Sequence, residues 1–218
     1  MQMILRDQRR FITLIILLLI AGLASAQDSS WKRRDSLRIA KYYKPHHIIW
    51  VTPTNAKSIN GIAIGVQATP LTDKPLTING INIDFGAVGF IALPTIVLLS
   101  VMNETQSDEG SLYAEEAEVF LNGISLSIGG EISCGINGIN ASGLITHAAY
   151  INGFSFSGIL SMTNSFKGIV IGSVVNVANK GVGLQIGLIN RCKKLKGLQL
   201  GLWNISGKRG LPVINWGI

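Results

Sequence analysis

The sequence predicts an all-β fold built from short repeated strands, and three observations carry this prediction. A unit that begins with Gly and alternates apolar with small residues recurs along most of the 218-residue chain. The leading glycines of the best-matched units lie 15 residues apart in four successive steps. Within each unit the apolar residues recur at every second position, which is the side-chain period of a β-strand. In a helix each of these many glycines would cost about 1 kcal/mol, and a helical repeat is therefore disfavoured.

The chain begins with a segment typical of exported proteins. Three Arg residues precede an apolar stretch at residues 11–23, and Ala24-Ser25-Ala26 follows. A basic start, a short apolar stretch and an A-x-A site form the pattern of a secretory signal peptide. We expect residues 1–26 to be removed after Ala26, because a membrane-spanning helix would need about 20 apolar residues.

A basic segment is expected next, at residues 27–46, where the chain carries six Lys and Arg. A second group of basic residues lies near the C-terminus, and the formal net charge is +7. Nucleic acid is not an expected partner, because the basic residues are not interleaved with the aromatic side chains that stack on bases. Solvated turns or anionic lipid headgroups fit this charge better.

The β-repeat domain is expected to cover residues 47–218 and to open with a strand at residues 47–52. Eight units follow, and we expect their leading glycines to be structural: Gly61, Gly80, Gly123, Gly138, Gly153, Gly168, Gly183 and Gly197. An irregular insertion near residues 90–120 interrupts the series. Its apolar run at residues 90–102 predicts a buried strand pair or a short apolar helix that plugs the mouth of the barrel. The acidic patch after that run predicts a surface loop.

Each repeated strand has one apolar flank and one flank of small, uncharged residues. Phe154 and Phe156 alternate with Ser155 and Ser157, and Glu131 is the single acidic residue between Leu121 and the C-terminus. Three architectures explain this pattern. The expected one is an antiparallel meander of strands of about ten residues that closes into a barrel, with its apolar flank on lipid. The alternative is a β-solenoid in which apolar rungs fill the core and glycines mark tight corners. A soluble sandwich is the third.

The dimensions of the strands favour the barrel over the solenoid. Five alternating positions, tilted by about 40°, give roughly 20 Å of height, close to the lipid-facing band of about 25 Å. In a barrel, lysines near the strand ends would lie at the headgroups, and Trp203 and Trp216 would contribute to an aromatic girdle.

The C-terminal units resemble a known family. Residues 183–190 read Gly-Leu-Gln-Ile-Gly-Leu-Ile-Asn, residues 197–204 read Gly-Leu-Gln-Leu-Gly-Leu-Trp-Asn, and Leu-Pro-Val-Ile-Asn-Trp ends at Trp216. This part resembles the bacterial surface repeat-containing proteins built from GLQIGLIN-type units, found in Bacteroidetes and spirochaetes. The resemblance covers roughly residues 55–218 and implies an exported, envelope-associated protein without a known activity. Asn82 and Asp84 depart from the pattern, because Gln and Gly would be expected there.

The sequence contains no convincing catalytic, cofactor or metal site. His46 and His47 are adjacent, so in a strand they point to opposite faces and do not form a joint metal site. The group Glu115, Glu116 and Glu118 lacks the spacing of an EF-hand calcium loop, so we expect a solvated loop there. A hydrolase needs a base paired with a nucleophile, and the repeats after Leu121 contain one His and one acidic residue. We therefore expect that the protein is not an enzyme.

The two cysteines, Cys134 and Cys192, are expected to be free thiols. In the repeat they lie four strands apart, about 19 Å along a sheet, whereas a disulfide needs Cα atoms within about 7 Å.

Taken together, these patterns predict a non-enzymatic, exported cell-envelope protein at the outer membrane or the cell surface, with membrane lipid as a partner. The alternative is a secreted or periplasmic β-repeat module that binds a protein or a glycan.

Overall fold

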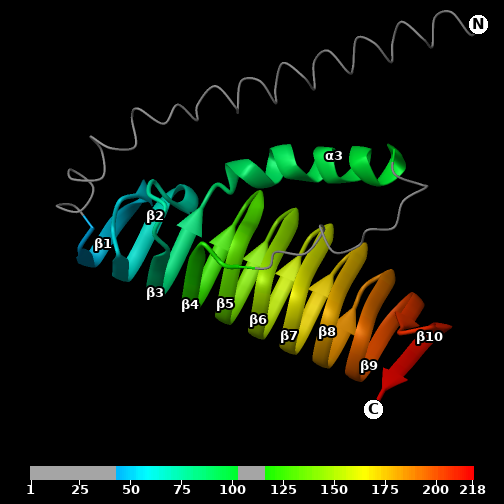
Figure 1. The fold of residues 1–218 in the computed structure, drawn as a ribbon. Helices are drawn as coiled ribbons and strands as arrows, with labels where there is room; N and C mark the ends of the chain where they lie inside the picture. Colours follow the sequence, from blue (N-terminus) through cyan, green and yellow to red (C-terminus); the bar gives the residue numbers. More distant parts are fainter. Residues whose placement is uncertain (1–42, 103–115) are drawn as a thin grey trace, which may run out of the picture. The chain divides into compact units, whose positions relative to one another are not determined.

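The computed structural model describes residues 43–102 and 116–218, and within them ten strands form one sheet in chain order (Figure 1). The elements are β1 (Pro45–Thr54), β2 (Ser58–Pro70), β3 (Leu76–Asp84), α3 (Ala87–Met102), β4 (Val119–Ser127), β5 (Gly130–Ser142), β6 (Ile145–Ser157), β7 (Leu160–Gly172), β8 (Val175–Ile186), β9 (Ile189–Ser206) and β10 (Arg209–Gly217). The predicted signal peptide and most of the basic segment at residues 27–46 lie outside the described residues.

The strands form a β-solenoid of about nine turns, which is the alternative architecture. The preferred prediction, an antiparallel meander closed into a barrel, is wrong. Strands β1 to β9 all pair in parallel, and only β10 runs antiparallel, along β9. Parallel pairing aligns each repeat with the same positions of the next, so all eight predicted structural glycines lie in one column.

The reason for this difference lies in how far the chain turns within one repeat. The expected unit was a straight strand of about ten residues, but β5, β6 and β7 are each 13 residues long and bent. In β6 the backbone bends at Ala149, which is skipped in the pairing with both neighbours, and again at Gly153, whose φ is +130°. A third bend follows at residues 158–159. One repeat therefore completes a full turn, and no separate crossover segment is needed between parallel strands.

These bends divide each turn into three straight runs, which in β6 are residues 145–148, 150–152 and 154–157. The predicted alternation of side chains is confirmed along them. In the third run Ser155 and Ser157 are buried, whereas Phe154 and Phe156 lie on the outside. The apolar residues of the Gly-initiated motif therefore face outwards. This differs from the solenoid alternative, in which the apolar residues of the repeat fill the core.

The interior of the solenoid is half apolar and half polar. One side is a column of large apolar side chains supplied mostly by the second run, namely Ile59, Ile78, Leu121, Ile136, Ile151, Phe166 and Leu195. The other side consists of polar columns from the first and third runs, with members such as Asn140, Ser155 and Asn190 fully buried. Such groups are tolerated inside because they hydrogen-bond to one another and to backbone carbonyls.

The insertion between β3 and β4 forms the helix α3, which lies along the outside of the first run of the solenoid (Figure 1). Of the two structures predicted for this apolar run, a helix is observed, but it covers the side of a solenoid and does not plug a barrel. Leu93 packs against a cluster of outward side chains formed by Ile145, Leu160 and Met162. Glycine makes this contact possible, because a Cβ at Gly89 would lie 2.5 Å from the carbonyl of Gly129. Among the described residues, no helix has the length and apolar character needed to cross a bilayer.

Candidate docking surface

The outer side of the third run forms a continuous apolar face across eight turns. It consists of the first and third residues after each structural glycine: Ile62, Ile64, Ile81, Ile83, Ile124, Leu126, Ile139, Ala141, Phe154, Phe156, Ile169, Ile171, Leu184, Ile186, Leu198 and Leu200. We call this set the apolar face. Many of its members are well exposed, for example Ile139 at 48% and Leu126 at 44%.

The apolar face is about as large as the largest apolar patch of a typical monomer. Its eight rungs are separated by seven spacings of about 4.8 Å, so it is roughly 34 Å long. With the exposed corner residues Val174, Leu188 and Leu202 beside it, it is roughly 13 Å wide and covers roughly 450 Å². The largest apolar patch of a typical monomer covers about 300–600 Å² and is often functional. The apolar face is therefore a candidate docking surface.

The column of glycines beside this face lets the third run bend tightly against its neighbours. All eight predicted structural glycines have positive φ, between +130° and +144°. A Cβ at Gly153 would lie 2.1 Å from the carbonyl oxygen of Gly138, and the same contact recurs from turn to turn. Glycine is therefore required at this bend by both backbone conformation and space.

The edge of the apolar face next to the glycines is polar. Five Asn side chains form an outer ladder, with each Nδ2 donating to the Oδ1 of the preceding Asn at 2.7–2.9 Å; they are Asn60, Asn79, Asn122, Asn137 and Asn152. The same column continues with Lys167, Val182 and Lys196, which are exposed. The apolar face is thus bordered by amides in the early turns and by two cations and a valine in the late ones.

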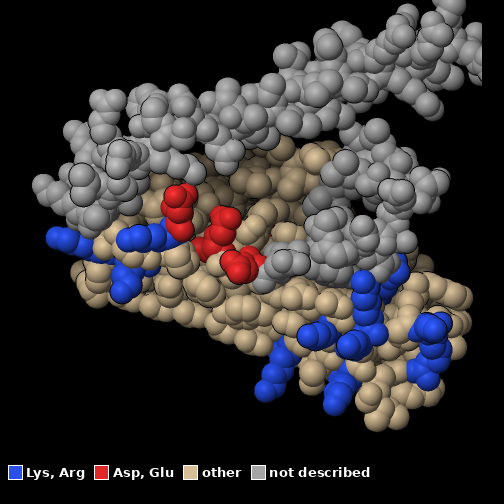
Figure 2. All heavy atoms as spheres, viewed as in Figure 1, with Lys and Arg blue, Asp and Glu red and all other residues tan. Residues whose placement is uncertain are grey.

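A basic groove of about 830 Å³ lies at the β8–β10 end of the solenoid. Its basic lining residues are Lys180, Lys193, Lys194, Lys196, Lys208 and Arg209, and Trp216 also lines it. Figure 2 shows Lys and Arg side chains gathered at this end without acidic side chains among them. Arg209 lies over the ring of Trp216, 4.6 Å from its centroid, and its Nε donates to Asn215 Oδ1 at 3.0 Å.

The Asn that ends the GLQIGLIN motif has a structural role inside the solenoid. Asn190 is fully buried, and its Nδ2 donates to the carbonyls of Gly187 and Leu200 at 3.1 and 2.9 Å. It also lies between Asn176 and Asn204, with amide–amide contacts of 2.8 Å. These contacts give buried polar groups near the third bend hydrogen-bond partners and link one turn to the next.

Asn82 and Asp84, which depart from the motif, occupy the same inward columns as their counterparts in the other turns. Asn82 Nδ2 contacts Asp84 Oδ2 at 3.1 Å, Ser125 Oγ at 3.1 Å and Glu131 Oε1 at 3.0 Å. Ser125 Oγ donates to Glu131 Oε1 at 2.5 Å. Burial, together with the nearby charge of Asp84, raises the pKa of Glu131 to about 8. Glu131 is therefore a neutral acid inside the solenoid at neutral pH.

The environment of Glu131 predicts that the protein loses stability as the pH rises. The folded state binds one proton more than the unfolded state between the ordinary pKa of 4.5 and about 8. The free energy of unfolding should therefore fall through this window and level off above it. Glu131→Gln should remove this part of the slope, as measured by urea unfolding at pH 5, 7 and 9. An unchanged slope in Glu131→Gln would contradict the buried neutral acid.

The two cysteines do not form a disulfide with each other. Cys134 and Cys192 are both free and buried, and they belong to one inward column in β5 and β9, four turns apart. Burial raises the pKa of both thiols, that of Cys192 to about 11. Buried, protonated thiols react slowly, so neither is placed for chemistry at the surface.

The other candidate site residues are not brought together. His46 stacks on Trp50, with ring centroids 3.6 Å apart, while His47 lies exposed beside it. Glu116 and Glu118 are exposed, and Glu115 lies outside the described residues. Within residues 43–102 and 116–218, no group of three or more His, Cys, Asp or Glu is arranged to hold a metal ion. What the sequence did not reveal was the basic groove, because its residues come from separate turns and the final strand.

The chain matches no protein-family model, no curated protein and no solved structure. The resemblance to surface repeat-containing proteins therefore stays a prediction based on the repeat motif.

Proposed function

We propose that the protein is a non-enzymatic, exported component of the cell envelope that lies on a membrane through its apolar face. The observation that carries this proposal is the outward orientation of two apolar residues in each of eight turns, with a single alanine among them. Apolar area of this size is unfavourable in water at roughly 25 cal/mol per Å², and a bilayer would cover it.

Two features of the chain support this location. The predicted signal peptide at residues 1–26 would direct the chain out of the cytoplasm. The late turns are strongly basic: residues 132–218 contain eight Lys and Arg and no Asp or Glu. Basic residues near an apolar surface are typical of proteins that bind the interface of anionic membranes.

A second candidate function is a secreted or periplasmic module that binds a protein or a glycan. The regular spacing of the turns favours it, since solenoids commonly present extended binding surfaces. An extended apolar partner segment would cover the apolar face as a bilayer would.

Fractionation of cells that make the full chain tests the proposal. We expect the protein, shortened by the signal peptide, in the membrane fraction of the envelope, and released by detergent but incompletely by salt. Recovery in the soluble periplasm would favour the binding module, and retention of the unshortened chain in the cytoplasm would refute export.

Polar substitutions on the apolar face should release the protein from membranes. Leu126→Ser with Ile139→Ser removes two exposed apolar side chains without changing the interior, and we expect the membrane-bound fraction to fall about tenfold. The matched control is Leu71→Ser with Ile91→Ser, two apolar residues that are also exposed but lie outside this face, in the β2–β3 loop and on α3. Equal loss in both variants would show that the apolar face has no special role.

A further inference from the structure

We propose that the basic groove at the β8–β10 end binds the phosphate groups of anionic phospholipid headgroups while the apolar face lies on the bilayer. This inference rests on the proposed membrane association and adds the lipid class and the residues that recognise it. The groove is lined by five Lys and one Arg and has a volume of about 830 Å³. These dimensions accommodate more than one headgroup phosphate.

The arrangement of the cations favours the binding of an anion. Lys180 and Lys194 are direct partners in neighbouring strands. Like charges at adjacent positions of a sheet repel each other and reduce stability. Residues 132–218 contain no Asp or Glu. A bound phosphate would relieve this repulsion and would form charge-assisted hydrogen bonds with Lys and Arg.

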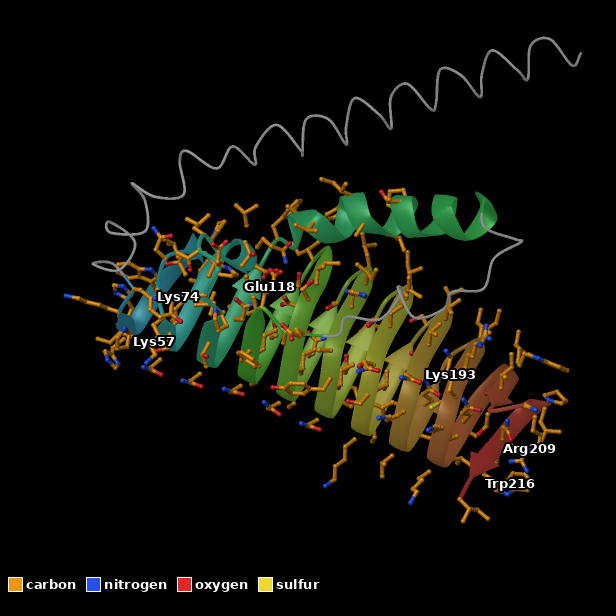
Figure 3. The ribbon with its side chains drawn as sticks, in the orientation of Figure 1. Lys57, Lys74, Glu118, Lys193, Arg209 and Trp216 are labelled. Carbon is orange, nitrogen blue, oxygen red and sulfur yellow. The ribbon has the colours of Figure 1, made fainter. Side chains whose placement is uncertain are left out.

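The groove is continuous with the apolar face. Trp216 lies opposite Leu198, and Ile214 lies opposite Leu200, so β10 extends both apolar columns by one strand. Trp216 also lines the groove. Figure 3 shows Arg209 and Trp216 together on β10, at the opposite end of the solenoid from Lys57 and Lys74. Trp is favoured at the level of lipid headgroups, where its ring is partly apolar and its N–H reaches water.

Other occupants fit these observations less well. A second copy of the chain would have only roughly 450 Å² of apolar face to bury, against about 800 Å² per partner in a stable interface. An acidic polysaccharide would satisfy the lysines but would leave Trp216 and the apolar face in water.

Vesicle binding by the full chain tests the proposal. Affinities are measured for vesicles of phosphatidylcholine alone and of phosphatidylcholine with 30% phosphatidylglycerol, and the readout is the ratio between them. The groove variant is Lys194→Glu with Lys196→Glu. The matched control is Lys57→Glu with Lys74→Glu, which makes the same change of net charge at exposed positions of the far end. Circular dichroism checks folding, and Lys194→Gln with Lys196→Gln serves as a milder second groove variant.

We expect phosphatidylglycerol to strengthen binding by the wild type. We expect this gain in affinity to be at least about tenfold smaller in the groove variant. The control should change it by less than about threefold, and the Gln variant should lie between these. Equal losses in both Glu variants would show a simple net-charge effect and would overturn the site. Equally tight binding of inorganic phosphate, or of an acidic polysaccharide without lipid, would overturn the headgroup as ligand.

The two proposals fail in different ways. If binding to phosphatidylcholine alone is lost in the apolar-face variant but phosphatidylglycerol has no effect, membrane association stands and the headgroup site is refuted. If neither vesicle binds, the proposed membrane association itself is refuted.

Discussion

Gly153→Ala is expected to destabilise the protein by at least about 3 kcal/mol. The φ of Gly153 is +130°, a conformation that residues with a Cβ rarely adopt, and the added Cβ would lie 2.1 Å from the carbonyl oxygen of Gly138. That oxygen belongs to the backbone, so it cannot move without shifting the neighbouring turn. Since each turn of a solenoid contacts only its neighbours, the damage should be greatest in β5, β6 and β7. Urea unfolding and hydrogen exchange measure both effects.

Gly210→Ala is the matched control for this substitution. Gly210 has no positive φ, and the nearest atoms to an added Cβ are those of the Trp203 ring, at 3.4–3.6 Å. These are ordinary contacts, so its stability should change by less than about 1 kcal/mol. If both variants unfold at the same urea concentration as the wild type, the glycine column is not required for the turn.

Asn190→Ala should be nearly as harmful, with a loss of about 3–5 kcal/mol. The amide of Asn190 donates to two backbone carbonyls at the bend and links Asn176 to Asn204 in a fully buried ladder. Alanine would remove all four contacts, and although Leu200 O keeps the N–H of Gly187 and Asn176 Nδ2 keeps the carbonyl of Ile186, each buried group left unsatisfied costs about 1–3 kcal/mol. Thermal and urea unfolding measure the loss.

The control for Asn190 is Asn152→Ala. Asn152 donates to Asn137 Oδ1 at 2.9 Å in the outer ladder, but its side chain is exposed and water can replace the contact. We expect a loss below about 1 kcal/mol. Comparable losses for the two Asn variants would mean that the buried ladder contributes no more than the exposed one.

The repeat and its alternation could be predicted from the sequence because they depend on local properties of the chain. The column of Gly153 and its equivalents follows from spacing alone, and the placement of Ser155 on the opposite flank to Phe154 and Phe156 follows from the two-residue period of a strand. Which of the two flanks faces the interior did not follow from this period, because the barrel and the solenoid assigned opposite flanks to it.

The candidate site was predicted only in part. The apolar flank and the basic residues near strand ends were visible in the sequence, and both belong to the proposed docking surface. The groove was not, because Lys180, Lys194 and Arg209 meet only after two turns and the reversal of β10 are in place. The burial of Glu131 was also missed. Its position in an inward column could have been counted from its place in the repeat, but a lone acidic residue is more often exposed.

The sequence by itself determined the 15-residue period, the glycine column and the alternation of side chains along each strand. Only the tertiary structure decided that successive strands run parallel as turns of a solenoid and that the last strand reverses. Alternation is a property of the extended backbone and is the same for both strand directions. Strand direction depends on the bends accumulated over a whole repeat, such as those at Ala149 and Gly153, and these bends leave no periodic pattern of hydrophobicity.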